Sequence, residues 1–189
     1  MSAFPEDIFD TVDQQLKSNQ DVSVATTARS VKIAGSRLKH QMTLQLLTDD
    51  LVALCDSNNI EVKKNSLEAL TSIIHSNWSS MKTQLKPKVG MILEFALKET
   101  KIRPELIQEV DLGPFKHKVD NGLPMRKAAF QLLETLQERA MESIDLSMVV
   151  ATIVNQGLSD TAEECVVLNL NILAKMCQNS VAVVVSQLD

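Results

Sequence analysis

The sequence has little of what sheet-rich folds and metal or disulfide sites need. It contains no tyrosine, only 3% aromatic residues, and five each of glycine and proline in 189 residues. This scarcity argues against sandwiches and doubly wound sheets and favours stacked helices. The cysteines Cys55, Cys165 and Cys177 are isolated from one another and form no CxxC pair, so they indicate neither a disulfide framework nor a zinc motif. We expect all three to be small buried apolar side chains.

Catalytic and phosphate-binding motifs are also missing. The sequence has no glycine-rich phosphate loop, no HExxH and no GxSxG, and its histidines His40, His75 and His117 are dispersed. We therefore predict no enzyme activity, no metal, no cofactor and no small-molecule substrate. The methionines fall at apolar helical positions; we expect Met81, Met91, Met125 and Met176, among others, to fill the core.

The charge and hydropathy of the chain exclude two kinds of partner. Nineteen basic residues face 24 acidic ones, for a net charge of −5, which argues against nucleic acid as the main partner. No apolar run approaches the roughly 20 residues that span a bilayer, and the first residues do not resemble a signal peptide. We expect a cytoplasmic and nuclear protein that does not bind a membrane.

A ladder of helices repeats along the chain. Val24, Val62, Met125 and Glu163 mark the starts of similar helices at intervals of 38, 63 and 38 residues, so the middle interval holds an insertion of 25 residues. A period of roughly 40 residues built from two helices is typical of HEAT repeats. The sequence therefore predicts an all-α HEAT-repeat solenoid with about four helix pairs and no separate second domain.

The expected pairs have approximate limits. They cover residues 4–36, 41–77, 80–140 with the insertion, and 143–179, and residues 180–189 begin a further repeat. Asp and Asn at the starts of second helices predict N-caps. The first helix of the third pair, expected over 81–98, contains Pro87, which either kinks it or lies in the first turn of a helix that starts later. Because the last residues are apolar rather than a polar cap, we expect the chain to be a segment of a longer protein.

The insertion near residues 105–121 predicts a β-hairpin. Gly113-Pro114 suits a type II′ turn at the tip. That tip pairs Leu112 with Phe115, Asp111 with Lys116, Val110 with His117, Glu109 with Lys118, and Gln108 with Val119. One face then carries the apolar side chains and His117, and the other carries two acid–base pairs worth roughly 0.2–1 kcal/mol each.

Two placements of this hairpin are open from the residues alone. A lone two-stranded hairpin is marginal in water, so it either packs against neighbouring helices through Leu112 and Phe115 or reaches a partner. If it projects, Phe115 is an aromatic anchor for a pocket on that partner.

The insertion also carries a specific resemblance. The pattern runs through Glu109-Val110-Asp111-Leu112-Gly113-Pro114-Phe115-Lys116-His117-Lys118-Val119-Asp120-Asn121-Gly122-Leu123 and on to Arg126-Lys127-Ala128-Ala129-Phe130. It resembles the C-terminal region of the cullin-associated, neddylation-dissociated family, also called TBP-interacting proteins. The resemblance is strongest over residues 98–138, continues to residue 189 and runs thinly back to about residue 59.

The resemblance implies a scaffold regulator of cullin–RING ubiquitin ligases. Such a protein docks on the N-terminal region of an unneddylated cullin in a cullin–RING complex, and its hairpin competes there with substrate-receptor adaptors. Carried over to this sequence, the contacts are expected from Val110, Leu112, Pro114, Phe115, Lys116 and His117. Family members are far longer, and their N-terminal repeats grip the other end of the cullin.

Two other readings explain the repeats. A karyopherin-like transport receptor would bind cargo on its concave face, and a scaffold of a phosphatase or transcription complex would bind other subunits. Neither accounts for the Gly-Pro-Phe-Lys-His insertion.

Overall fold

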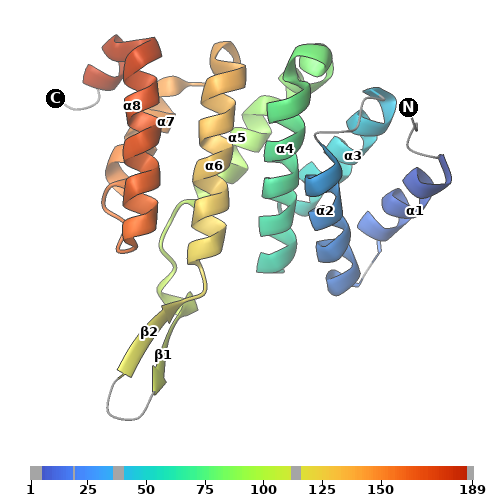
Figure 1. The fold of residues 1–189 in the computed structure, drawn as a ribbon, viewed down its shortest axis with the longest axis horizontal. Coiled ribbons are helices and arrows are strands. Elements are labelled where there is room, and N and C mark those ends of the chain that lie inside the picture. The colour runs from blue at the N-terminus through green and yellow to red at the C-terminus, as the bar shows by residue number, and fades with distance from the viewer. Residues whose placement is uncertain (1–5, 19, 36–40, 112–115, 187–189) are drawn as a thin grey trace.

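The computed structural model describes residues 6–18, 20–35, 41–111 and 116–186 of the chain. They form two rows of helices, with α2, α4, α6 and α8 in one row and α1, α3, α5 and α7 in the other (Figure 1). The helices are α1 (Glu6–Leu16), α2 (Asp21–Gly35), α3 (Gln41–Leu54), α4 (Ile60–Leu85), α5 (Val89–Glu99), α6 (Leu123–Ala140), α7 (Leu146–Thr152) and α8 (Glu163–Val185). The predicted HEAT-repeat solenoid with an inserted hairpin is confirmed; the limits of its repeats stay a prediction.

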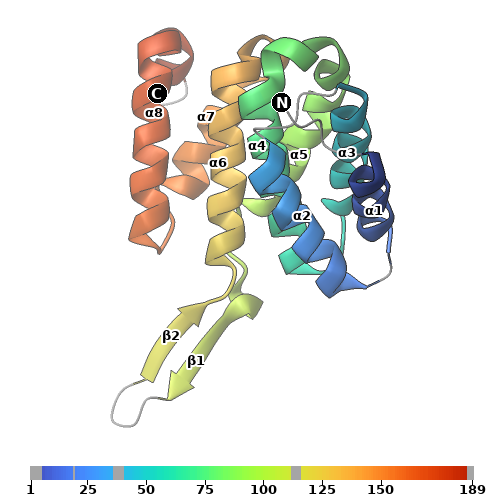
Figure 2. The same cartoon turned by 45° about the vertical axis from the view of Figure 1, so that its right-hand side comes forward.

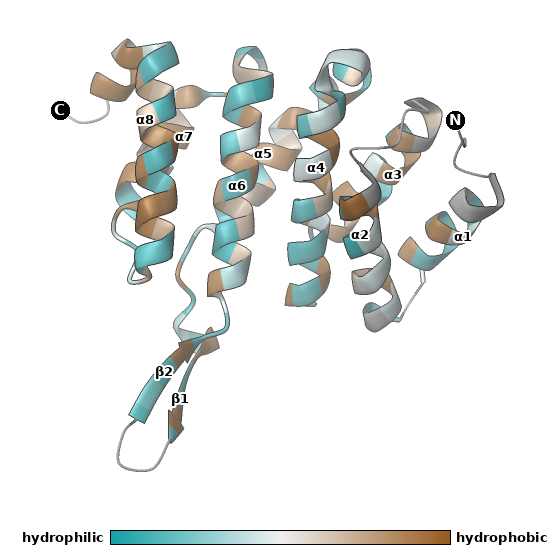
Figure 3. Ribbon diagram, in the orientation of Figure 1, coloured by the Kyte–Doolittle hydropathy of each residue, from teal (hydrophilic) through white to brown (hydrophobic). Residues whose placement is uncertain are grey.

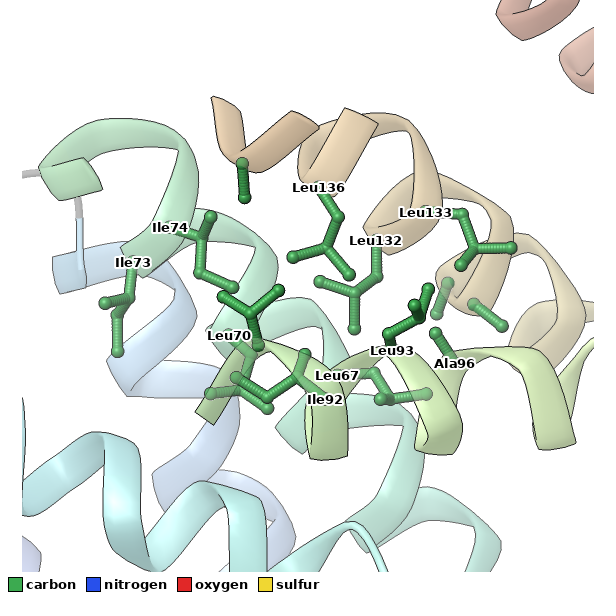
Figure 4. Packing of buried hydrophobic residues seen from close by; sticks show 14 of the residues in the cluster. Leu67, Leu70, Ile73, Ile74, Ile92, Leu93, Ala96, Leu132, Leu133 and Leu136 are labelled. Atoms are coloured by element: carbon green, nitrogen blue, oxygen red, sulfur yellow. The ribbon is translucent and has the colours of Figure 1, made fainter. Parts of the chain in front are cut away.

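A main core runs between the two rows, with a small second cluster of Val24, Ala25 and Val62 between α2 and α4. The centre of the main core is formed by α4, α5 and α6, which contribute side chains with at most 6% exposure that face one another (Figure 4). These side chains are Leu67, Leu70, Ile73 and Ile74 of α4, Ile92, Leu93 and Ala96 of α5, and Leu132, Leu133 and Leu136 of α6. Truncating one such leucine to alanine costs about 2–5 kcal/mol, because the rigid neighbours leave a cavity. The helices are therefore held by shared apolar burial rather than by each pair alone.

Side-chain caps begin two of the helices. The Asn59 side chain accepts hydrogen bonds from the backbone N–H groups of Glu61 and Val62, at 2.9 and 3.2 Å. Asp145 caps α7 in the same way. The cap predicted at Asn59 is confirmed, and it also places the buried Val62 three residues later.

The start expected for the first helix of the third pair coincides with a break in α4. The backbone at Met81 is non-helical, with φ −121° and ψ 15°, and a second helical stretch follows to Leu85. A 3₁₀ turn, Lys86–Lys88, follows, and α5 begins at Val89. Pro87 therefore lies in the turn before α5, where its missing N–H breaks no helical bond. The helix expected over 81–98 therefore begins at the break at Met81, and the 3₁₀ turn around Pro87 interrupts it before α5.

The last helix corrects one expectation and agrees with another. Cys165, not Glu163, is the buried residue three positions after the N-cap of α8, as Val62 and Met125 are in α4 and α6. The backbone at Ser180 is non-helical, with φ −152° and ψ 50°, and a second helical stretch follows to Val185, which agrees with a new element that begins at residue 180. The further repeat beyond this kink stays a prediction.

Several residues expected in the core are exposed. Met81, Met125 and Met176 are buried as predicted, but Met91 is 53% exposed on α5. Cys177 is exposed on α8, whereas Cys55 and Cys165 are buried. The helical period alone did not separate the buried positions from those beside them.

Candidate protein-docking hairpin

The insertion forms a projecting β-hairpin between α5 and α6. A 3₁₀ turn, Pro104–Leu106, leads into β1 (Ile107–Asp111), and β2 (Lys116–Asp120) returns to the start of α6. The ribbon extends beyond the ends of the helices in two views related by 45° (Figures 1 and 2). The strands therefore project from the array instead of folding down on it.

The strand register agrees with the sequence. The antiparallel pairs include Gln108 with Val119, Glu109 with Lys118, Val110 with His117, and Asp111 with Lys116. The four predicted pairs in this part of the ladder are confirmed. The fifth, between Leu112 and Phe115, and the turn at Gly113-Pro114 lie outside the described residues. Because side chains alternate across a strand, Val110, His117 and Val119 share one face.

That face leaves apolar groups in solvent. Val110 is 38% exposed and Val119 is 37% exposed, and the two lie on neighbouring strands. No residue of β1 or β2 is buried. A ribbon that buries so little of itself gains little stability from its own contacts. Its exposed apolar side chains are available to a partner surface.

The predicted contact residues divide into two groups. Val110, Lys116 and His117 lie on the described strands and are exposed, which fits a docking role. Leu112, Pro114 and Phe115 lie outside the described residues, so their role as contacts stays a prediction.

The charged face differs from the expected pairing. Lys116 Nζ lies 3.7 Å from Glu109 Oε2, which is a diagonal neighbour rather than the residue directly opposite. Both side chains are more than half exposed, so this pair contributes little to folding stability. Lys116 can therefore change partner at low cost when another acidic group approaches.

The base of the hairpin is fixed by groups that sequence reasoning missed. The Asn121 N–H donates to the Leu106 carbonyl at 3.1 Å and closes the ribbon where it leaves the array. Next to it, buried Arg126 of α6 forms ion pairs with Asp120 of β2 and with Asp160. Arg126 follows the apolar anchor Met125 and Asp160 precedes the next second helix, but nothing in the spacing of these residues brings them together.

Ion pairs join the second helices of neighbouring repeats. Lys32 of α2 binds Glu68 of α4 at 2.9 Å, and Lys175 of α8 binds both Glu134 and Glu138 of α6, at 2.5 and 2.8 Å. The charged side chains of these pairs on the row of second helices are therefore already paired with one another. The hairpin, with its exposed valines and a Lys116 that is held by a long, exposed pair with Glu109, is better suited to recruit a partner.

The described residues offer no metal site, and the thiols of Cys55 and Cys165 are unreactive. The described residues hold no cluster of three potential metal ligands. Burial raises the pKa of the Cys55 thiol to about 12 and that of Cys165 to about 11, so neither forms a thiolate readily near neutral pH. A hollow of about 270 Å³ lies between α2 and α4 and is lined by Arg29, Asn59 and Glu61, among others.

One helix departs from the expectation about membranes. By length and composition α8 could cross a bilayer, with a mean hydropathy of 1.2 over its most apolar window. The C-terminal end of α8 is hydrophobic in Figure 3. Within the array, α8 packs through Cys165, Ile172 and Met176 and pairs Lys175 with α6, although only 17% of its most apolar window is buried. Length and apolarity alone do not separate a membrane-spanning helix from a helix of a solenoid.

Known proteins share both the sequence and the fold. A 30% identical relative from Dictyostelium discoideum and a 34% identical one from Drosophila melanogaster, each called cullin-associated NEDD8-dissociated protein 1, match 83% and 82% of the chain. The chain spans about 12% of the length of each. A crystal structure of an engineered protein has the same fold over 95% of this chain and 68% of its own, with a TM-score of 0.61 at 16% identity.

The family assignment rests on more than half of the chain. Residues 84–189 match the model of the TIP120 family, described as TATA-binding protein interacting. The matched region starts just before α5 and includes the hairpin, Arg126 and both helices of the last pair. The chain belongs to the TIP120 family.

Proposed function

We propose that the chain is a cullin-docking scaffold whose hairpin competes with substrate-receptor adaptors for the N-terminal region of an unneddylated cullin. Docking of this kind would regulate the assembly and exchange of cullin–RING ubiquitin ligases in the cytoplasm and nucleus. The relatives named cullin-associated NEDD8-dissociated proteins support the choice of partner.

The observation that carries the proposal is the projecting ribbon. Val110 and Val119 are exposed on one face, and Lys116 is 73% exposed on the other. Apolar side chains lose water on docking, while a rim charge steers the approach and fixes the orientation. A ribbon with both features fits a groove on another protein better than it fits a small molecule or a nucleic acid.

Binding to an unneddylated cullin–RING complex tests the partner. We expect the 189-residue chain to bind and Lys116→Glu, Val110→Asp and Phe115→Ala each to weaken binding by about tenfold, or ~1.4 kcal/mol. Lys86→Glu is the matched control for charge, because Lys86 is exposed in the 3₁₀ turn at the opposite end of the helices. Binding by all three hairpin variants that equals that of the parent chain, or no binding by the parent chain, would contradict the proposal.

Competition is tested separately. An adaptor-bound cullin–RING complex should lose adaptor as the chain is added, and Lys116→Glu should require about tenfold more protein for the same effect. If chain and adaptor bind together with unchanged affinities, the chain docks without competing. Binding that depends on the row of second helices instead would favour a karyopherin-like receptor or another scaffold.

A further inference from the structure

Arg126 is a buried cation shared between two parts of the molecule. Its side chain is 1% exposed, and Nη2 lies 2.8 Å from Asp120 Oδ2 at the end of β2. On its other side, Nε and Nη2 donate to the two oxygens of Asp160, at 2.7 and 3.0 Å. One guanidinium therefore joins the hairpin, α6 and the turn before α8.

The second carboxylate is itself held in place. The Asp160 side chain is fully buried, and Oδ1 also accepts the Ala162 N–H at 2.8 Å. A two-pronged Arg–carboxylate contact fixes orientation as well as distance, because both groups are planar. The Arg126–Asp160 pair is thus a rigid element of the helix array to which Asp120 is attached.

Asp120 is the part of this cluster that belongs to the hairpin. It accepts the Gly122 N–H at 2.8 Å in the turn between β2 and α6. A Cβ added at Gly122 would lie 3.2 Å from both Asp120 Oδ1 and the Leu106 side chain, so the turn packs closely. Although burial pushes the pKa of Asp120 upward, the hydrogen bonds from Arg126 and Gly122 hold it below its ordinary value. Asp120 therefore stays charged near neutral pH.

We propose that Arg126 is a positioning residue that sets the direction of the hairpin relative to the helix rows. It does so by holding Asp120 of the ribbon against Asp160 of the next repeat. The link between direction and docking rests on the proposed cullin-binding function, but the positioning itself does not. With Asp120 released, the ribbon keeps the Asn121–Leu106 hydrogen bond at its base and can swing about it.

A purely stabilising ion cluster would behave differently. Removing one partner of a buried pair leaves an uncompensated charge and destabilises the whole domain. Asp120, however, is 19% exposed and lies outside the helices, and Asp160 remains to neutralise Arg126 after its removal. Substitution at Asp120 therefore separates the direction of the hairpin from the folding of the array.

Spin-label distances measure that direction without any partner. Labels are attached to Lys118→Cys on β2 and to the native Cys177, which is exposed on α8 while Cys55 and Cys165 are buried. The parent should give one narrow distance distribution. Asp120→Ala should broaden and shift it without loss of helical circular dichroism. Glu105→Ala, which removes an exposed carboxylate in the turn that leads into β1, is the control and should leave the distribution narrow.

One further variant and a binding measurement complete the test. Arg126→Met keeps the bulk of the side chain and should broaden the distance distribution as Asp120→Ala does. If Arg126→Met fails to fold, the distribution of Asp120→Ala alone tests the proposal. An unchanged distribution in folded Asp120→Ala overturns the proposal. Asp120→Ala should also weaken cullin binding by about tenfold. A broadened distribution with unchanged cullin affinity would instead contradict docking through the hairpin and leave the positioning role intact.

Discussion

Lys63 of α4 and Glu99 at the end of α5 form a buried ion pair, with Nζ and Oε1 3.1 Å apart and side-chain exposures of 12% and 3%. Arg103, four residues after Glu99, binds the other carboxylate oxygen. Glu99 thus neutralises two cations where α5 leads toward the hairpin. The pair joins two successive repeats and fixes the point from which the ribbon departs.

Glu99→Ala should destabilise the chain by about 3 kcal/mol, because Lys63 loses a buried counter-charge. Urea unfolding followed by circular dichroism measures the loss. The adjacent Lys98→Ala is the control, since the Lys98–Asp56 pair is exposed and 3.5 Å long. It should change the free energy of unfolding by less than about 1 kcal/mol. Similar losses in both variants would mean that burial of Glu99 does not matter.

Replacing glycine by alanine should change folding stability in opposite directions at Gly157 and Gly90. At Gly157, which ends the π-helical turn Ile153–Gly157, an added Cβ would lie 2.3–2.6 Å from the buried Asn169 side chain. We expect Gly157→Ala to destabilise by about 1–3 kcal/mol. At Gly90 in α5 nothing lies within 4 Å of the added Cβ, and Gly90→Ala should stabilise by about 0.5–1 kcal/mol. Thermal melts of both variants check the pair, and a stabilised Gly157→Ala would contradict the packing described.

The contact between α1 and α3 should make stability depend on pH. Burial, followed by a hydrogen bond shared with Asp13, raises the pKa of Asp50 from 3.8 to about 6. The folded chain thus favours the neutral carboxyl, and this stabilisation is full below pH 3.8 and is lost as the pH rises to about 6. The contribution of Asp13 to stability has the opposite pH dependence, because Lys17 lowers the pKa of Asp13. That contribution is lost as the pH falls below 3.8.

Asp50→Asn removes the buried charge at Asp50. Relative to the parent, we expect it to gain stability between pH 4 and pH 7 by on the order of 1 kcal/mol. Denaturant titrations across this range measure the difference. Asp49→Asn is the matched control, because Asp49 is half exposed and pairs with Lys88. A gain that does not vary with pH would assign the effect of Asp50→Asn to packing instead.

Thiol reactivity should be confined to one cysteine. In the folded chain we expect iodoacetamide to modify exposed Cys177, while buried Cys55 and Cys165, with pKa values of about 12 and about 11, stay unmodified. Mass spectrometry of the digested protein gives the extent at each site, and denaturation should make all three react. Modification of Cys55 before unfolding would show that α3 opens locally.

The parts that were predictable from sequence are those set by local periodicity. The alternation through Val110 and His117 was enough to find the strand register, and Asn59 was enough to place a helix start. The helix starts expected at residues 81 and 180 coincide with non-helical backbone at Met81 and Ser180. The predicted burial of Met91 and Cys177 was wrong, because the stacking of the repeats decides which side of an apolar helix packs against a neighbour.

The cluster around Arg126 was beyond local reasoning for a different reason. Asp120 and Asp160 are 40 residues apart, and each taken alone reads as an ordinary turn or cap residue. Only the return of the chain to the same end of the array brings both to one guanidinium. Long-range ion clusters of this kind leave no periodic pattern in a single sequence.

The hydrogen bond from Asn121 to Leu106 joins the chain's exit from the helix array to its re-entry. Because the two points adjoin, the length and sequence of the ribbon can vary without any change in the register of the repeats behind it. Recognition and architecture are therefore structurally separable in this molecule. A ribbon of another specificity could be grafted between Leu106 and Asp120 onto the same frame, with Asp120 kept to hold Arg126.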